Sequence, residues 1–366
     1  MYKYLALQYF IKKNVDWKEK LSKPPYSLII KEKGNLVLFK YTQGVSDFNE
    51  PICNEARGII LEKGTWKVVR IAFNKFFNLG EEHAADIDWE TAVATEKMDG
   101  SLISFYWYNG EWRVATNGCI DAEDAPCDGA FKTYKDLIDR ALEDNPINFN
   151  SLNKNITYTF ELCTPHNQQV VEYKDFKLYF LLARDNRTFE EYIDFKVAWL
   201  NGFEMPKLYP IKGNKEDFKK FVETFGDDKE GIVVKDSGFN RVKIKTETYF
   251  QLHHWLNNGN VGRKRIFELL ETGEDAEFLA YFPRYTKAFA RMAAEIYLAK
   301  CRVQRVESVV ADWKNNHPDA TKKEFSEFVN LMTKEYQFYF YKAYDYGKIE
   351  PPEDINMRMK FYRIEA

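Results

Sequence analysis

The chain has 366 residues, of which 45% are hydrophobic and 16% aromatic, and this composition excludes an intrinsically disordered protein. Its 53 basic and 56 acidic side chains give a formal net charge of -3, so only a local basic surface, not a global positive field, could bind a polyanion. Five scattered cysteines without a C-x-x-C pair argue against a disulfide framework or a structural zinc site.

The N-terminal segment MYKYLALQYFIKKN has an apolar face but lacks the apolar core of a signal peptide. No stretch of the sequence approaches the length needed to span a membrane. Together with the cysteine usage, these features predict a cytoplasmic protein without membrane association.

Short strand-like segments follow one another from about Ser27 to Ile244. Several are expected to form hairpins at Lys-Gly, Asn-Gly or Ser-Gly turns, as in YWYNGEWRVA. Between them, FKTYKDLIDRALED and KEDFKKFVETFG repeat apolar residues at helical spacing. This mixture predicts an α+β domain built on antiparallel sheets.

Beyond Trp255 the pattern becomes helical. RKRIFELLETG, YTKAFARMAAEIYLAKCRVQRVESVVADWKNN and TKKEFSEFVNLMTKEYQFYFYKAYDYG combine strong helix formers with helical periodicity and almost no strand signal. We therefore expect two domains, over residues 1–254 and 255–366, with the joint between Thr248 and Gly262.

The segment TEKMDGSLIS, from Thr95 to Ser104, places a lysine two residues before an Asp-Gly turn. Asp99 and Gly100 are expected to shape that turn. Lys97 would then stand at a tight strand connection, with its amine facing the space that the strands enclose. The alternative is a solvated hairpin lysine.

Lys243 and Lys245 lie two residues apart in the strand-like segment RVKIKT, so their side chains project from the same face. Two like charges there repel one another unless an anion or acidic side chains lie between them, and a triphosphate would satisfy them. The alternative for each charged residue in these strands is a solvent-facing strand end. The other charged residues embedded in apolar strand segments are Arg57, Lys75, Lys97, Glu161 and Glu230.

In their residues and in their order along the chain, these segments resemble the motifs of the covalent nucleotidyltransferase superfamily, and specifically those of the bacteriophage RNA ligase 1 family. EKMDGSLIS is similar to the family's nucleophile motif, ITYTFEL to its third motif, EGIVVK to its fourth and RVKIKT to its fifth. EARGIILE and NKFFNLGE resemble upstream segments of the same family. The resemblance, over about residues 37 to 255, implies an antiparallel-sheet nucleotidyltransferase (ATP-grasp-like ligase) domain followed by an all-α C-terminal domain of RNA specificity.

The resemblance implies an ATP-dependent RNA ligase, acting as a monomer, that joins 5′-phosphate and 3′-hydroxyl ends of single-stranded RNA, including broken tRNA. Lys97 would take AMP from ATP, with Mg²⁺ or Mn²⁺ bound, and pass it to the RNA 5′-phosphate before the 3′-hydroxyl seals the strand. An amine with an ordinary pKa of about 10.4 is a poor nucleophile at neutral pH. We expect neighbouring cations and partial burial to lower the pKa of Lys97.

The matched motifs also imply how the nucleotide is held. Arg57 and Lys75 would hold the triphosphate tail, while Lys243 and Lys245 would grip the α-phosphate. Tyr41 matches an aromatic residue at the nucleoside, and the alternative for it is a packed strand tyrosine.

Four more residues match family positions around the reaction. Glu161 would contact the ribose, and Tyr249 in TETYFQLHH matches a tyrosine needed for activity. Glu230 and Asp275 would bind the metal ion. The alternative for Asp275 is an ordinary solvated helix start.

One segment departs from the family pattern. Where the family carries lysines in a K-x-K-G-S-like segment, this chain reads VATNGCIDAEDAPCDG, so Asn117 and several acidic residues replace a positive surface. The substrate 5′ end would be held differently there.

The helical region carries basic residues that could follow an RNA backbone. Aromatic side chains beside them, Tyr281, Phe282 and Tyr285, would be available for base stacking. The alternative is a solvated helix face over buried aromatics. The basic residues are Arg263, Lys264 and Arg265, and the helically spaced Arg284, Lys287 and Arg291.

Two other functions remain open on the sequence. The first is a nick-sealing duplex RNA or DNA ligase, or a capping enzyme, of the same superfamily. Those enzymes usually append a small β-barrel after the fifth motif, whereas this chain is helical there. The second is a non-catalytic nucleotide- or RNA-binding protein that keeps the fold.

Overall fold

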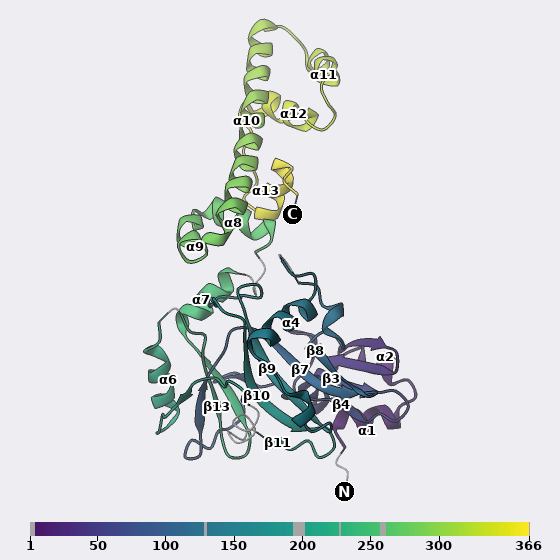
Figure 1. Cartoon of the computed structure of the whole chain (residues 1–366). Coiled ribbons are helices and arrows are strands. Elements are labelled where there is room, and N and C mark those ends of the chain that lie inside the picture. Colours follow the sequence, from purple (N-terminus) through teal and green to yellow (C-terminus); the bar gives the residue numbers. More distant parts are fainter. Residues whose placement is uncertain (1–3, 128–129, 193–201, 227, 257–260, 366) are drawn as a thin grey trace. The chain divides into compact units, whose positions relative to one another are not determined.

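The computed structural model describes residues 4–127, 130–192, 202–226, 228–256 and 261–365 (Figure 1). The chain divides into two compact units, Met1–His254 and Trp255–Ala366. The first unit contains three sheets, and every described element of the second unit from α8 onward is helical.

The first sheet has the strand order β1-β2-β3-β4 with antiparallel neighbours. Apolar side chains from the N-terminal helices and from β2 and β3 share one core, which includes Leu7, Phe39 and Ile59. The strands are β1 Ile29–Lys33, β2 Leu36–Lys40, β3 Arg57–Glu62 and β4 Val68–Arg70, and the helices are α1 Ala6–Lys13, α2 Trp17–Leu21 and α3 Pro51–Glu55.

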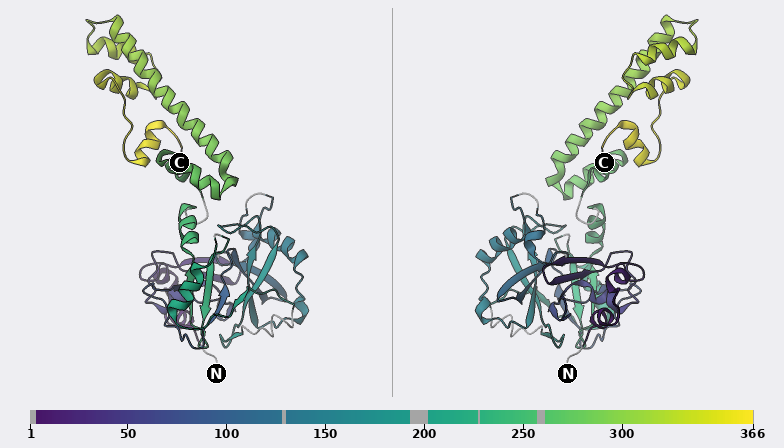
Figure 2. Two further views of the ribbon diagram at one scale, coloured as in Figure 1. Left: turned by 90° about the vertical axis from the view of Figure 1, so that its left-hand side faces the viewer. Right: turned by 90° about the vertical axis from the view of Figure 1, so that its right-hand side faces the viewer.

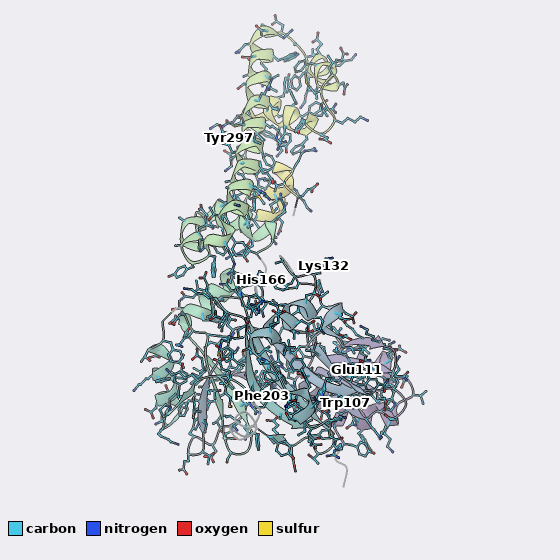
Figure 3. All side chains as sticks on the ribbon, in the orientation of Figure 1. Trp107, Glu111, Lys132, His166, Phe203 and Tyr297 are labelled. Atoms are coloured by element: carbon cyan, nitrogen blue, oxygen red, sulfur yellow. The ribbon has the colours of Figure 1, made fainter. Side chains whose placement is uncertain are left out.

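The second sheet has the order β11-β10-β9-β7-β8, again antiparallel throughout. The expected Asn-Gly hairpin is confirmed, because Tyr108 pairs with Glu111 across the turn between β7 and β8. Figure 3 labels Trp107 of β7 and Glu111 of β8. Helix α4 packs its apolar side chains into the core of this sheet, which also holds the ring of Phe203. The elements are β7 Ser101–Tyr108, β8 Glu111–Thr116, η1 Ala122–Asp124, α4 Tyr134–Asp144, η2 Phe149–Ser151, β9 Ile156–Cys163, β10 Lys177–Asp185 and β11 Glu191–Tyr192.

The third sheet has the order β12-β6-β13-β14-β5. Its pairs are antiparallel except for β14 with β5, which run parallel. Helix α6 buries Phe218 and Val222 against Ile232 and Val242 of this sheet. The elements are β5 Phe77–Asn78, β6 Val93–Glu96, β12 Leu208–Tyr209, α6 Lys215–Glu223, β13 Gly231–Lys235, β14 Arg241–Lys245 and α7 Glu247–Trp255.

Strands β6 and β7 follow one another along the chain but belong to different sheets. The four residues that join them therefore pass from the third sheet to the second and do not close a hairpin. The hairpin interpretation of Lys97 is wrong for this reason: the lysine stands where two sheets meet.

In the second unit, the long helix α10 contacts α8, α12 and α13 (Figure 2). Trp313 of α10 packs its ring against Phe325 of α11 at a centroid distance of 5.0 Å. Among the residues with described positions, no helix is both long and apolar enough to cross a membrane. The elements are α8 Arg263–Thr272, α9 Asp275–Tyr281, η3 Pro283–Tyr285, α10 Thr286–Asn316, α11 Lys322–Asn330, α12 Gln337–Tyr346 and α13 Ile355–Tyr362.

Phe218 provides a test of the packing beneath the third sheet, because its side chain is fully buried. Phe218→Ala should lower the free energy of unfolding by about 3–5 kcal/mol, through lost burial and the cavity left behind. Phe239 is 42% exposed, so Phe239→Ala should cost less than about 1 kcal/mol. Urea denaturation followed by tryptophan fluorescence measures both, and equal costs would contradict this packing.

Candidate active site

A cavity of about 410 Å³ opens in the first unit where the second and third sheets meet. Aromatic and aliphatic side chains, among them Phe76, Leu102 and Met205, form its apolar walls. Its charged lining residues are six cations and two carboxylates, and this excess of positive charge suits a polyanionic ligand. They are Arg57, Lys97, Lys235, Arg241, Lys243 and Lys245, and Glu96 and Glu161.

Lys97 follows directly on β6, and its backbone N–H donates to the Gly231 carbonyl over 2.9 Å. Its side-chain Nζ donates to Glu230 Oε2 over 2.6 Å. The other oxygen of the same carboxylate, Oε1, lies 3.0 Å from Lys245 Nζ. Glu230 is only 3% exposed, so one buried carboxylate holds two cavity-lining lysines.

Lys97 does not have the lowered pKa that the sequence predicts. Burial acts to lower the pKa of its amine, but the opposing attraction of Glu230 and Glu161 is stronger and raises the pKa above its ordinary value. The prediction was wrong because it counted neighbouring cations and placed no carboxylate against the amine. With its pKa raised in this way, Lys97 is an ammonium group at neutral pH.

A lowered pKa is found instead at Lys243, which lines the same cavity. Burial, together with the positive charges of Lys75, Lys97, Lys245 and Arg57, lowers its pKa to about 7. Binding an anion would relieve that repulsion and favour the charged form.

Glu161 lies on β9, opposite Leu102 of β7, and lines the cavity. Burial and, to a smaller degree, the negative charges of Glu230 and Asp99 raise the pKa of its carboxyl to about 7, against the pull of Lys97 and Arg57. Its carboxyl group is therefore poised to exchange a proton near neutral pH.

Asp99 does more than shape the turn after Lys97. Its Oδ2 accepts hydrogen bonds from the backbone N–H groups of Val170 and Val171, each over 2.8 Å, and its Oδ1 accepts from the Tyr249 hydroxyl over 2.7 Å. Gly100 allows the turn to approach β9, since a Cβ there would lie 2.2 Å from the Leu162 carbonyl oxygen. Tyr249 is thus buried as an anchor of the turn and is not among the cavity-lining residues.

Arg57 and Lys75 occupy different positions with respect to the cavity. Arg57 lines it, with its guanidinium carbon 5.0 Å from the Phe76 ring centroid, and its Nη1 makes no hydrogen bond in the described structure. Lys75 lies outside the lining, with its Nζ 5.1 Å from the Tyr41 ring centroid. Tyr41 itself packs against Phe48 and is also outside the lining.

The two expected metal ligands lie in different units. Asp275 is the first residue of α9 in the second unit, and Glu230 is engaged with two lysines in the first. Within the described residues, no group of three His, Cys, Asp or Glu side chains could hold a metal ion. Mg²⁺ commonly binds only one or two protein carboxylates and takes its other ligands from water and anionic oxygens, so a site for it does not require three such side chains.

Sequence reasoning missed three charged cavity residues, Glu96, Lys235 and Arg241. The alternation that placed Lys243 and Lys245 on one face also includes Arg241, two residues earlier in β14. Arg241 is paired with Glu191 over 2.6 Å, a contact that no local pattern indicates.

The basic residues of the helical unit differ in their surroundings. Arg263 pairs with Glu295 over 2.6 Å, and Arg265 with Glu268 over 3.2 Å, so part of that cluster's charge is neutralised. Phe282 is 3% exposed and packs against Phe278, so its expected role in base stacking is wrong. The side chains of Arg284, Lys287 and Arg291 are exposed.

A family model described as RNA ligase matches residues 55–249 of the chain. A putative bifunctional polynucleotide kinase/RNA ligase of Autographa californica nuclear polyhedrosis virus is 31% identical over 268 residues, covering 68% of this chain and 38% of that protein. An RNA ligase of Rhodothermus phage RM378 is 29% identical over 180 residues, covering 40% of this chain and 41% of that protein. The chain thus spans less than half the length of either relative.

A solved archaeal ATP-dependent RNA ligase aligns with 83% of this chain and 83% of its own, at 17% identity and a TM-score of 0.44. A putative ATP-dependent DNA ligase from Aquifex aeolicus aligns with 75% of this chain and 74% of its own, at 13% identity and a TM-score of 0.47.

The raised pKa of Glu161 predicts a pH-dependent stability. The Glu161 carboxyl group keeps its proton up to about pH 7 in the folded state but releases it near pH 4.5 in the unfolded state. The protonated carboxyl group therefore stabilises the folded state fully below pH 4.5, and this contribution is lost as the pH rises through 7. The free energy of unfolding of the wild type minus that of Glu161→Gln should therefore fall by on the order of 2–3 kcal/mol between pH 4.5 and 8. Urea titrations across this range measure the difference, and a constant difference would contradict the assignment.

Proposed function

Because the chain belongs to the RNA ligase family, we propose that it joins 5′-phosphate and 3′-hydroxyl ends of single-stranded RNA at the expense of ATP, with Lys97 as the residue that carries AMP. The observation that supports this most directly is that Lys97 lines a cavity together with five further cationic residues. A triphosphate offers the negative charge that such a lining lacks.

In the first step, Lys97 attacks the α-phosphate of ATP. Its ammonium must first lose a proton, and the 2.6 Å hydrogen bond to Glu230 provides an acceptor. The nitrogen lone pair then forms the P–N bond, the bond from the α-phosphorus to the bridging oxygen breaks, and pyrophosphate leaves with that electron pair. Lysyl-AMP remains on the enzyme.

The cations around Lys97 would stabilise charge as it develops on the phosphates. Lys243 and Lys245 would hold the α-phosphate, and Arg57, whose Nη1 has no partner in the described structure, would hold the leaving pyrophosphate with Lys75. When phosphate draws Lys245 away, Glu230 loses one of its two partners and becomes a better proton acceptor for Lys97.

The remaining residues would orient the nucleotide. Glu161 would contact the ribose, Tyr41 the nucleoside, and Tyr249 would act through Asp99 to fix the turn that carries Lys97. Bound Mg²⁺ or Mn²⁺ would neutralise phosphate charge, and we propose the Glu230 carboxylate among its ligands, since metals of this kind prefer carboxylate oxygens.

Two transfers complete the proposed reaction. The RNA 5′-phosphate oxygen attacks the phosphorus of lysyl-AMP, the P–N bond breaks, and Lys97 recovers its amine. The RNA 3′-hydroxyl then attacks the activated 5′-phosphate, forms the phosphodiester and expels AMP. Positioning and charge neutralisation are the protein's contribution to both steps.

The helical unit would hold the RNA, including broken tRNA. The exposed side chains of Arg284, Lys287 and Arg291 support this role, because lysine and arginine side chains neutralise backbone phosphates. In the described part of the chain the cysteines are thiols and not disulfides, which supports a reducing cytoplasm as the place of action.

The nucleophile is tested by incubating the protein with Mg²⁺ and ATP labelled at the α-phosphate, after pretreatment with pyrophosphate to remove any bound AMP. Wild-type protein should keep label after denaturation, and Lys97→Ala should keep at least about a thousandfold less, because no other side chain replaces the nitrogen. Lys135→Ala, on the surface of α4, is the matched control and should label like the wild type. Full labelling of Lys97→Ala would show that another residue is the nucleophile.

The substrate is tested with three 5′-phosphorylated probes: single-stranded RNA, nicked duplex RNA and nicked duplex DNA. We expect single-stranded RNA to be joined fastest, because the described part of the chain after β14 is helical and contains no β-barrel for clamping a duplex. Faster sealing of a nick would favour a duplex ligase. Absence of an adduct from folded protein would favour a non-catalytic nucleotide-binding protein.

A further inference from the structure

Arg70, the last residue of β4, is a fully buried arginine that contacts the cavity-lining residue Asn117. Its Nη1 donates to the Gly58 carbonyl, and its Nη2 donates to Ser104 Oγ over 2.8 Å and to Asn117 Oδ1 over 3.2 Å. Gly58 allows this approach, since a Cβ there would lie 2.6 Å from Arg70 Nη1. The backbone is therefore shaped around the guanidinium.

The charge of Arg70 has no carboxylate partner among the residues that the structure describes. Its acceptors are carbonyl, hydroxyl and amide oxygens, and its Nε makes no hydrogen bond. Burial lowers the pKa of the guanidinium to about 9, so the group is still charged at neutral pH. A buried charge without a counter-ion is costly to retain for packing alone, and a nearby bound anion would compensate it.

Asn117 connects Arg70 to the cavity, because it accepts a hydrogen bond from Arg70 and is one of the cavity-lining residues. A guanidinium has only donors, so the asparagine must present its oxygen to Arg70. This contact fixes the orientation of the amide and leaves the Nδ2 group, with two N–H donors, without a partner in the described structure. Arg57, with its unpartnered Nη1, lines the same cavity.

We propose that Asn117 Nδ2 binds a phosphoryl oxygen, and that Arg70 is the positioning residue that orients the amide and supplies positive charge behind it. This inference rests on the proposed ligase function and identifies how phosphate is held where the sequence has no lysine-rich segment. The phosphate has two possible sources, the nucleotide's pyrophosphate portion and the RNA 5′ end. Both present the same anionic oxygen.

Asn117→Asp separates binding from folding. The substitution keeps the shape of the side chain and gives Arg70 a carboxylate partner, so the melting temperature should stay unchanged or rise. The same change removes the N–H donors and cancels the local charge, so affinity for phosphate should fall by about tenfold or more. If Arg70 and Asn117 had only a structural role, the melting temperature would stay unchanged or rise while the affinity for phosphate stayed the same.

Calorimetric titration with inorganic pyrophosphate, on wild type and Asn117→Asp, tests the nucleotide source. Joining of a chemically pre-adenylated RNA, which bypasses ATP, tests the RNA source through its KM. If Asn117→Asp weakens only pyrophosphate binding, the Asn117 amide binds the nucleotide. If it raises only the KM for pre-adenylated RNA, the amide binds the RNA 5′ end. Asn148→Asp, an exposed residue outside the cavity lining, adds the same charge and should change neither.

Arg70→Lys and Arg70→Met test the positioning role. Lysine keeps the charge and should retain more pyrophosphate affinity than methionine, which lacks both charge and donor. If Asn117→Asp binds pyrophosphate and uses pre-adenylated RNA like the wild type, the proposal is overturned. Failure of the proposed ligase function would look different, because wild-type protein would then form no AMP adduct at all.

Discussion

The buried carboxylate of Glu230 governs the geometry of the site, because both of its oxygens are used to hold lysines that face the cavity. A carboxylate removed from water is unfavourable unless its charge is paired, and Lys97 and Lys245 provide that pairing. The same contacts hold two cations close together before any ligand binds. When phosphate enters, it can take over one lysine while the other stays in place, so little rearrangement is required for binding.

The meeting of two sheets makes this arrangement possible. Lys97 follows β6 of the third sheet, and Glu161 lies on β9 of the second, so residues from two sheets line one cavity. Asp99 ties the connecting turn to the segment at Val170 and to Tyr249 through buried hydrogen bonds. These contacts fix the turn independently of the ligand, as a preorganised site requires.

Local patterns in the sequence were sufficient for the longer strands, the main helices and the shared face of Lys243 and Lys245, because strand alternation and helical periodicity depend on near neighbours. They did not indicate the two-residue strands β5, β11 and β12. Local sequence patterns could not predict the raised pKa of Lys97. It depends on Glu230, which is 133 residues away and reaches the lysine only through the pairing of β6 with β13. Arg70 and Asn117 likewise meet across two sheets, and no spacing in the sequence indicates their contact.

The most direct test of the central claim is to locate AMP on the protein by peptide mass spectrometry after incubation with ATP and Mg²⁺. The account predicts one AMP per chain, attached to the side chain of Lys97, and its removal when pyrophosphate is added. AMP on Lys243, Lys245 or any other residue, or a Lys97 that stays unmodified in folded protein, would contradict it.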